Sequence, residues 1–348
     1  MKLYFAPMEG ITGRILRNTY ESVFTGQIET YFAPFISCAG KKGISPKDRR
    51  ELLPENNPGI RLIPQVLENR AEEFGYLAQA LKQIGYDEIN LNLGCPSKTV
   101  VSKGRGAGFL TDPDELDRFL EAAFETCEKS KQRLSIKTRL GMEETEEFDR
   151  LFEIYERYPY SELIIHPRLQ KDYYKFPVRT AFFDDAWEKR KNDQLIYNGD
   201  IIKCSQVTAL KEKYPGMPAV MIGRGFLMHP YLTQMIREDE ETENSGSDTG
   251  STGMNVSVGG DAIRRDQPSP EHFRKLWLFH DRLYAAYKEE MPGMKVVLFK
   301  MKELWCYLGE SFPVTDDERG KRYKKALKQI RKCQRYEDYD GAVQMLRM

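Results

Sequence analysis

Short apolar segments alternate with helical patterns through the first two thirds of the chain. The segments are rich in Val, Ile, Leu, Tyr or Phe and have the length of strands. We expect strands at residues 3–7, 30–35, 60–66, 88–93, 134–138, 162–165, 195–197 and 219–222. Between them apolar residues recur every three or four positions, which predicts helices such as 71–84, 114–128, 146–157, 204–213 and 227–237.

Strands that alternate with helices predict crossover connections and a parallel sheet. Eight such units in about 235 residues match the (β/α)8 TIM barrel, which typically takes about 250 residues. An open doubly wound sheet is the alternative, and it is less favoured because it need not contain eight strands. We therefore expect an α/β fold with a TIM-barrel catalytic domain at residues 1–237.

The pattern breaks at residues 238–270, which are acidic at first and then rich in Ser, Thr and Gly. This composition buries little apolar surface and predicts a flexible linker or insertion. Only helical patterns follow, so residues 271–348 are expected to form a helical C-terminal domain. Its first helix carries an apolar stripe of Phe273, Leu276, Trp277, His280, Leu283, Tyr284 and Tyr287.

Two further helices are expected in this C-terminal region. One follows Pro292-Gly293, and another begins at Thr315, where Thr315 and Glu318 have the spacing of a capping box. The formal net charge of the chain is zero, yet residues 319–335 hold nine Lys or Arg residues and no carboxylate. A basic stretch of this kind suits a polyanionic partner, although a solvated helix face is an equal alternative from the residues alone.

Composition narrows the class of protein. A hydrophobic share of 40% and a charged share of 30% are typical of a globular protein. No apolar run approaches the roughly 20 residues that span a bilayer, and the N-terminus lacks a signal-peptide core. Six cysteines without a C-x-x-C pair and four histidines predict no metal site. We expect a cytoplasmic protein that does not contact membranes.

Polar residues gather where the predicted strands end, and catalytic groups of a TIM barrel lie at the carboxyl ends of its strands. In chain order these positions are Met8, Glu9, Gln65, Asn92, Cys95, Lys137, His166, Asn198, Gly199, Asp200, Gly223 and Arg224. The last two units combine glycines with an arginine, which favours a phosphate site over two ordinary turns. Lys137 lies inside a strand pattern, so it is either a Schiff-base lysine or a partner for the negative charge of a reduced flavin.

Cys95 stands in the segment Asn92-Leu93-Gly94-Cys95-Pro96, just past a strand end, and a glycine-rich stretch from Gly104 to Gly108 follows. A structural thiol would normally lie within the apolar run instead. Lys98, Lys103 and Arg105 make the loop basic, as a site that meets a phosphate backbone would be.

These motifs resemble the tRNA-dihydrouridine synthase family from Ala6-Pro7-Met8-Glu9-Gly10 to Ile222-Gly223-Arg224-Gly225. The resemblance implies an FMN-binding barrel, a helical tRNA-binding domain and NADPH as reductant. It implies flavin contacts from Pro7, Met8, Gln65, Lys137, His166, Asn198, Gly199, Asp200, Gly223 and Arg224. Glu9, beside Met8, is predicted to bind the cofactor as well.

The same resemblance makes Cys95 the general acid and places Asn92 beside the uracil. Hydride would pass from flavin N5 to uracil C6 and a proton from Cys95 to C5. We also predict RNA contacts from Lys98, Arg105, Arg168, Lys321, Arg322, Lys324 and Lys325. Pro167 departs from the glycine that is usual in the family between this histidine and arginine, so we expect the loop at Arg168–Tyr174 and its fit to RNA to differ from the family while His166 keeps its place.

Three alternatives remain open. An FMN barrel that acts on a free pyrimidine, such as a dihydroorotate dehydrogenase, would not need a basic helical domain. A Schiff-base aldolase would use Lys137. An RNA-binding protein without catalysis would not need Cys95. We expect a monomer.

Overall fold

The computed structural model describes residues 1–40, 43–246 and 265–348. The chain forms two compact units, and each contains separate stretches of the sequence. The first comprises Met1–Arg14, Ile28–Asp200 and Ala209–Ile222, and the second comprises Ile15–Gln27, Ile201–Thr208 and Gly223–Met348. Of the predicted linker, residues 247–264 lie outside the described residues.

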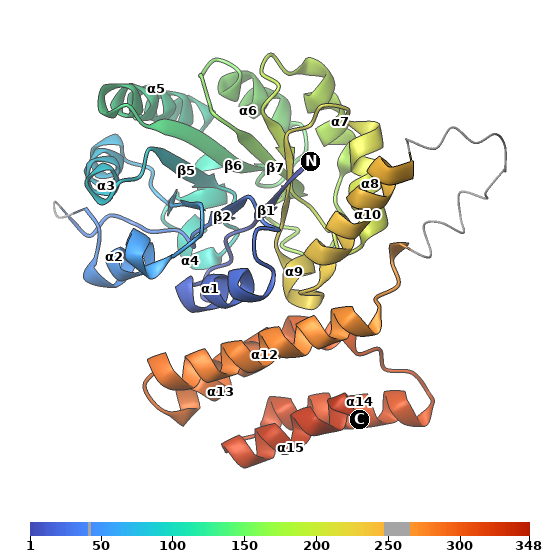
Figure 1. The fold of residues 1–348 in the computed structure, drawn as a ribbon. Helices are drawn as coiled ribbons and strands as arrows, with labels where there is room; N and C mark the ends of the chain where they lie inside the picture. Colours follow the sequence, from blue (N-terminus) through green and yellow to red (C-terminus); the bar gives the residue numbers. More distant parts are fainter. Residues whose placement is uncertain (41–42, 247–264) are drawn as a thin grey trace, which may run out of the picture. The chain divides into compact units, whose positions relative to one another are not determined.

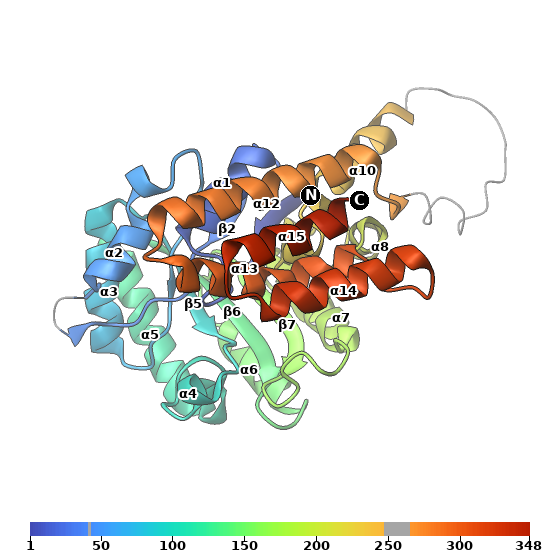
Figure 2. The ribbon, with the colours of Figure 1, turned by 90° about the horizontal axis from the view of Figure 1, so that it is seen from below.

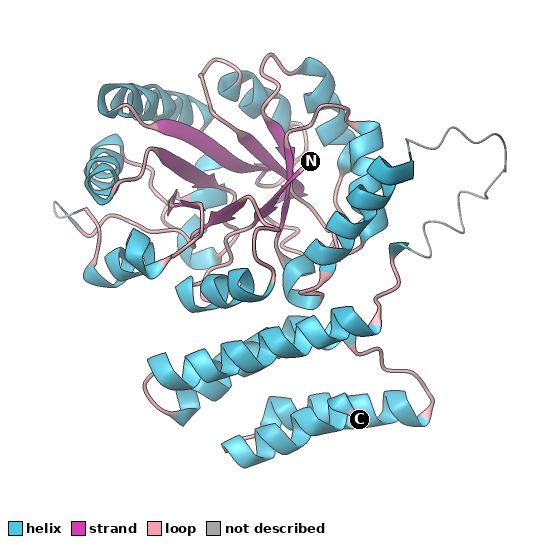
Figure 3. Cartoon of the chain, viewed as in Figure 1, coloured by secondary structure: helices cyan, strands magenta, loops and turns pink. Residues whose placement is uncertain are grey.

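The first unit is built on parallel strands (Figures 1 and 3). The strands are β1 (Lys2–Phe5), β2 (Thr30–Phe32), β3 (Leu62–Ile63), β4 (Gln65–Val66), β5 (Glu88–Leu93), β6 (Arg133–Gly141), β7 (Leu163–Leu169), β8 (Leu195–Tyr197) and β9 (Ala219–Ile222). Their order is β3-β2-β1-β9-β8-β7-β6-β5-β4. The two ends of this order, β3 and β4, are separated in the chain only by Pro64, so the sheet closes on itself.

Pro64 divides the third predicted strand into two. Proline has no amide hydrogen to donate, although the Pro64 carbonyl still accepts from the Asn90 amide at 3.0 Å. Beyond it, Val66 forms a parallel bridge with Ile36, in the segment after β2. With β3 and β4 counted as halves of one strand, the predicted eight-stranded TIM barrel is confirmed.

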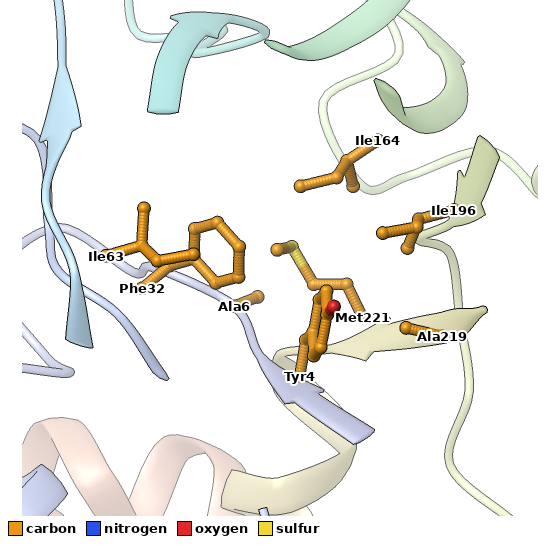
Figure 4. Close-up of a cluster of buried hydrophobic side chains, with 8 residues drawn as sticks. All are labelled: Tyr4, Ala6, Phe32, Ile63, Ile164, Ile196, Ala219 and Met221. Carbon is orange, nitrogen blue, oxygen red and sulfur yellow. The ribbon is translucent and has the colours of Figure 1, made fainter. Parts of the chain in front are cut away.

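Apolar side chains fill the interior of the barrel (Figure 4). The cluster consists of Tyr4, Ala6, Phe32, Ile63, Ile164, Ile196, Ala219 and Met221. All are at most 5% exposed, and the rings of Tyr4 and Phe32 lie 5.6 Å apart. Burial of each large apolar side chain stabilises the fold by about 1.5–3 kcal/mol, so this core fixes the strands that carry the polar residues at their ends.

Helices of the first unit are α2 (Pro46–Leu52), α3 (Ala71–Ile84), α4 (Lys98–Val101), α5 (Pro113–Ser130), α6 (Glu147–Tyr155) and α7 (Thr180–Lys189). Short 3-10 helices lie at Pro54–Asn56 and Gly106–Thr111. The start of α5 shows how the sequence sets a boundary, because the Asp112 side chain accepts from the Glu115 amide at 3.0 Å and Pro113 occupies the first position. Helix α8 (Cys204–Lys213) begins in the second unit and ends in the first.

The second unit contains most of α1 (Arg14–Val23) together with α9 (Arg224–Met228), α10 (Leu232–Gly246), α12 (Pro270–Glu290), α13 (Met294–Leu308), α14 (Glu318–Lys332) and α15 (Tyr336–Arg347). A 3-10 helix at Gly309–Ser311 follows α13. The single helix that we predicted at 227–237 is wrong, since Pro230 lies between α9 and α10. Helix α10 also continues past residue 237 to Gly246, into the predicted linker.

The predicted capping box at Thr315 is also wrong. Asp317 is the N-cap of α14, and its side chain accepts from the Gly320 amide at 2.7 Å. The hydroxyl of Thr315 donates to the same carboxylate at 2.5 Å. An aspartate two positions later therefore takes the role that spacing had given to Thr315.

The last four helices form a bundle, in which α14 and α15 lie side by side (Figure 2). The predicted stripe of α12 is its packing face, because Leu276, His280 and Leu283 are buried. Helix α12 also packs on α1 within the second unit. The Tyr20 and Phe279 rings meet edge to face at 5.6 Å, and Lys275 Nζ donates to the Val23 carbonyl at 3.1 Å.

No helix within the described residues is long and apolar enough to span a membrane.

Candidate active site

Cys95 lies in a loop that Asn92 holds at the end of β5. The Asn92 side-chain oxygen accepts from two backbone amides, Gly94 at 3.0 Å and Cys95 at 2.9 Å. The Asn92 amide nitrogen donates to Gln65 Oε1 at 2.7 Å. Asn92 is buried and both ends of its amide have partners, so it fixes the turn that leads into Cys95.

The partners of Asn92 extend across three strands. Gln65 Nε2 donates to Asn90 Oδ1 at 2.7 Å, and Asn90 Nδ2 donates to Ser135 Oγ at 2.9 Å. These side chains are buried, where an unpaired polar atom would cost about 1–3 kcal/mol. The network ties the ends of β4 and β5 to β6, and Gln65, a predicted cofactor residue, is one of its members.

The glycine-rich stretch after Cys95 packs directly against the cysteine. Gly106 has a φ of +57°, and a Cβ at this position would lie 3.0 Å from both the Cβ and the carbonyl oxygen of Cys95. The Cys95 carbonyl accepts from the Ala107 amide at 3.1 Å. The positive φ and these tight contacts favour glycine at 106, since a side chain would strain the backbone and push against Cys95.

Arg139 braces the same loop from β6. Its Nε donates to the Gly94 carbonyl at 2.9 Å, and its Nη1 donates to the carbonyls of Leu169 and Tyr173 at 2.9 and 3.1 Å. Arg139 is 1% exposed. A buried guanidinium with several carbonyl acceptors is a strong structural tie, and here it joins the Cys95 loop to the segment after β7.

Lys137 lies two residues before Arg139, in register with Asn92 on the neighbouring strand β5. Its side chain is half-buried. Burial and the nearby charge of Arg139 lower the pKa of the Lys137 ammonium from 10.5 to about 7. An amine held this way in the middle of β6, beside Asn92 of β5, is suited to meet an anionic group of a ligand, which would favour its charged form.

Cys95 is half-buried. Burial raises the pKa of the Cys95 thiol above its ordinary value, against the opposing influence of Arg139 and Lys137. The thiol therefore keeps its proton at neutral pH. This protonation state suits a proton donor better than a nucleophile, which needs the thiolate.

His166 and Arg168 form a second buried group at the end of β7. Arg168 Nη1 lies 3.0 Å from His166 Nε2 and donates to Asp200 Oδ1 at 3.0 Å. Arg168 Nη2 also binds Asp200, and Arg168 Nε donates to the Phe176 carbonyl at 2.7 Å. Arg168 is 2% exposed, and this geometry argues against the RNA contact that we predicted for it.

Asp200 and Gly199 show that the segment after β8 is tightly built. Asp200 has a φ of +41°, in the left-handed region that a non-glycine residue adopts rarely. A Cβ on Gly199 would lie 2.8 Å from Val178 Cγ1. Asn198 Nδ2 donates to the Met221 carbonyl at 2.8 Å, which joins this segment to β9. Bidentate pairing with Arg168 holds the unusual backbone of Asp200 in place.

The remaining predicted cofactor residues lie at the start of the chain and after β9. The Met8 amide donates to Thr12 Oγ1 at 2.8 Å, Pro7 is half-buried and Glu9 is exposed. Gly223 is the N-cap of α9 and Arg224 its first residue, and both belong to the second compact unit.

The predicted RNA-binding residues have different surroundings. Lys98 is exposed, whereas Arg105 forms ion pairs with Glu68 and Glu73, each at 2.7 Å. On α14, Arg322 is half-buried and its Nε donates to the Met345 carbonyl at 3.1 Å. We use the term basic face of α14 for its exposed lysines, which are Lys321, Lys324, Lys325, Lys328 and Lys332.

Several residues that shape the site were not predicted. Arg139, Asn90 and Glu68 are buried and polar, and Gln170 Nε2 donates to the Pro96 carbonyl at 2.9 Å. A signal existed for Arg139, because it lies two positions after Lys137 and strand periodicity puts both on one face. No local pattern marks Gln170, whose partner is 74 positions away.

Known proteins of one family are similar in sequence to this chain. The family model for dihydrouridine synthase matches residues 4–254. A probable tRNA-dihydrouridine synthase of Staphylococcus aureus is 29% identical over 235 residues, which are 65% of this chain and 68% of the relative. A protein of the same description from Staphylococcus epidermidis is 26% identical over 284 residues, or 79% and 82% of the two chains.

Among solved structures, a variant of morphinone reductase in complex with tetrahydroNAD is similar in fold. The TM-score is 0.50 at 12% identity, over 68% of this chain and 86% of that chain. The match of the family model covers well over half of this sequence. The chain therefore belongs to the dihydrouridine synthase family, and it is an oxidoreductase.

Proposed function

We propose that this protein reduces specific uridines of tRNA to dihydrouridine, with FMN bound in the barrel, NADPH as the reductant and Cys95 as the proton donor. The observation that carries the proposal is the arrangement of Cys95. Asn92 accepts from the Cys95 amide and Arg139 donates to the Gly94 carbonyl, so the backbone that carries a protonated thiol is fixed just past the end of β5. The register of β5 and β6 sets Asn92 beside Lys137. Family membership and the names of the relatives supply the substrate class.

The residues at the strand ends fit a flavin. Lys137 is a half-buried cation whose lowered pKa reflects poor solvation, and an anionic ring edge would offset that cost. His166, Asn198 and Asp200 add polar groups on neighbouring strands, and Gly199 has no room for a side chain. We propose that these residues hold FMN together with Pro7, Met8, Glu9, Gln65, Gly223 and Arg224. When bound and reduced, FMN supplies the hydride that adds to uracil C6.

The protein's own groups account for the other half of the addition. The C5=C6 bond of uracil is conjugated with the C4 carbonyl, so addition at C6 builds up negative charge that a proton at C5 must neutralise. Cys95 Sγ donates this proton, and the raised pKa of the Cys95 thiol keeps it protonated at neutral pH. Asn92 fixes the Cys95 backbone, and thus the direction of the thiol, through its contact at 2.9 Å.

A tRNA substrate also needs a surface for the body of the RNA. The basic face of α14 offers five exposed lysines. Together with Lys98 in the Cys95 loop, these charges would attract the phosphate backbone and offset the few kcal/mol needed to unstack the target base. A cytoplasmic location follows from the proposed substrate and reductant.

Replacement of Cys95 by alanine tests the proposal. General acid catalysis contributes about 10²–10⁴-fold, so Cys95→Ala should lose dihydrouridine formation by that factor while it keeps its yellow flavin spectrum and its affinity for tRNA. Cys306→Ala, at an exposed cysteine of α13, is the control and should keep full activity. Unchanged product yield from Cys95→Ala would refute the role of Cys95.

The substrate class is tested with small molecules. Wild-type protein should turn over transcribed tRNA but neither free uracil nor dihydroorotate. Turnover of a free pyrimidine with no reaction on tRNA would replace the proposal with a small-molecule reductase. A colourless protein that borohydride inactivates in the presence of a carbonyl substrate would instead favour an aldolase at Lys137.

A further inference from the structure

Arg105, in the stretch that follows the Cys95 loop, is held by acidic residues from another part of the barrel. Its Nη2 lies 2.7 Å from Glu68 Oε2 and 2.7 Å from Glu73 Oε2. Glu68 follows β4, and Glu73 lies in the first turn of α3. One guanidinium nitrogen is therefore shared by two carboxylates that are distant from it in sequence.

Glu68 is the deeper of the two acids. It is 0% exposed, and its other oxygen accepts from the Cys38 amide at 2.5 Å. A carboxylate in this position is costly unless it is paired and hydrogen-bonded. Burial raises the pKa of the Glu68 carboxyl to about 7, and its Oε2 meets the Arg105 guanidinium as an ion pair without hydrogen-bond geometry. The positive charge of Arg105 therefore favours the ionised form of this acid.

Asn69 strengthens the same junction. Its Nδ2 donates to the carbonyls of Lys103 and Gly104 at 3.1 and 3.2 Å, and its Oδ1 accepts from Arg105 Nε at 3.4 Å. Glu68 and Asn69, which follow β4, thus contact Lys103 and the first two residues of the glycine-rich stretch, Gly104 and Arg105. The glycine-rich stretch is therefore held by the side chains of Glu68 and Asn69 as well as by its own neighbours in the chain.

The glycine-rich stretch also contacts Cys95. A Cβ on Gly106, the residue after Arg105, would lie only 3.0 Å from Cys95, and the Ala107 amide donates to the Cys95 carbonyl. A shift of Arg105 would therefore be passed to the backbone that carries the thiol. Misplacement of a reacting group by about 1 Å can cost about 100-fold in rate.

We propose that Arg105, clamped by Glu68 and Glu73, is a positioning residue that holds the Cys95 thiol in its reactive place. The inference rests on the proposed function for its effect on turnover. It replaces the RNA contact that the basic character of the loop predicts for Arg105. The two roles differ in what they demand of Glu68, because a fully buried acid cannot touch RNA.

The experiment compares Arg105→Ala, Arg105→Lys, Glu68→Gln and Asn69→Ala with the wild type. The control is Arg118→Ala, which removes an exposed arginine that pairs with Glu115 on α5. Turnover at saturating tRNA, the dissociation constant for tRNA and the rate of flavin reduction by NADPH are measured for each variant. In parallel, alkylation of Cys95 by iodoacetamide is followed by peptide mass spectrometry, with exposed Cys306 as the internal reference.

Arg105→Ala and Glu68→Gln should lower turnover by about 10- to 100-fold, with tRNA affinity and flavin reduction unchanged. Cys95 should be alkylated several-fold faster relative to Cys306, because the loosened loop exposes the thiol. Arg105→Lys should recover part of the turnover, since lysine keeps the charge but not the fork. Asn69→Ala, which leaves the buried charges paired, should show a milder form of the same pattern if the charge-altering variants fail to fold.

Weaker and less salt-dependent tRNA binding by Arg105→Ala, with normal turnover at saturation and normal Cys95 alkylation, would overturn the proposal in favour of an RNA contact. The alkylation assay needs neither flavin nor tRNA. If wild-type protein fails to modify tRNA, the proposed function is refuted. The alkylation rates would still show whether Arg105, Glu68 and Glu73 hold the Cys95 thiol in place.

Discussion

Polar and charged groups are buried and hydrogen-bonded around the Cys95 loop (residues 92–96), whereas they are exposed to solvent on the basic face of α14. Around Cys95, Asn92, Arg139 and Gln170 are buried, and each donates or accepts at fixed distances of about 2.9–3.0 Å. On α14, lysines extend into solvent from one helix. Chemistry at a single atom requires groups of fixed position, whereas attraction of a polyanion requires only charge of one sign over a surface.

The largest expected effect comes from loosening the first region. Asn92→Ala removes the acceptor of the Gly94 and Cys95 amides and should lower turnover on tRNA by about 100-fold, with tRNA affinity unchanged. Single-turnover measurement of dihydrouridine against tRNA concentration separates the two parameters. If Asn69→Ala, which alters contacts of the glycine-rich stretch, lowers turnover equally, then the turn that Asn92 holds is no more important for turnover than that stretch.

Changes to the basic face of α14 should lower the affinity for tRNA rather than the turnover. A variant with Lys321, Lys324 and Lys325 changed to glutamate should bind tRNA about tenfold more weakly or worse at low salt, with near-normal turnover at saturation. The slope of log affinity against log salt should become shallower by about 1 for each lysine that contacts a phosphate. Lys129→Glu, at an exposed lysine of α5, is the matched control. A loss of turnover at saturation would mean that α14 also orients the target base.

The packing of the glycine-rich stretch on Cys95 can be tested by measuring the stability of a Gly106 variant. Gly106→Ala should lower the free energy of unfolding by about 1–3 kcal/mol, because the position combines a φ of +57° with contacts at 3.0 Å. Gly75→Ala in α3, where an added Cβ meets nothing within 4 Å, should raise it by about 0.4–1 kcal/mol. Chemical denaturation of both variants measures the difference. Equal changes would show that the glycine-rich stretch is not packed on Cys95.

Lys137 should produce an effect on stability that depends on pH. Its pKa is about 7 in the folded protein and 10.5 in its ordinary state, so the unfolded chain binds more protons between these values. The stability cost of the charged lysine is complete below about pH 7 and disappears as the pH rises to 10.5. Flavin-free Lys137→Met should therefore melt above the wild type at pH 7, and the gap should narrow toward pH 10. A constant gap would show that the Lys137 ammonium is well solvated.

The sequence predicted those parts of the molecule that follow from local periodicity and chain order. Strands 88–93, 195–197 and 219–222 and helices 71–84 and 204–213 match the structure at both ends. Parallel strands bring their carboxyl ends together, so Asn92, Lys137 and His166 could be grouped before any coordinates. Pro64 was a missed signal, since proline interrupts a strand ladder.

Long-range partners could not be predicted in this way. The RNA contacts of Arg105 and Arg168 stay predictions, but the carboxylate partners of both guanidiniums were not foreseen, and for Arg168 the partner Asp200 is 32 positions away. Periodicity describes which face a residue occupies, but not which residue of another element meets it. The N-cap of α14 was mispredicted for a related reason, because two nearby polar residues, Thr315 and Asp317, could each take that position.

The packing of α12 on α1 has a consequence for the order of events during synthesis. Lys275 and Val23, which meet in this contact, are 252 positions apart. At translation rates of about 5–20 residues per second, the ribosome needs roughly 13–50 s to make the intervening chain. Throughout that interval Tyr20 lacks the ring of Phe279 that covers it in the finished molecule. The nascent chain thus carries an uncovered aromatic surface on α1, and a chaperone that shields α1 until α12 emerges would protect this protein from aggregation.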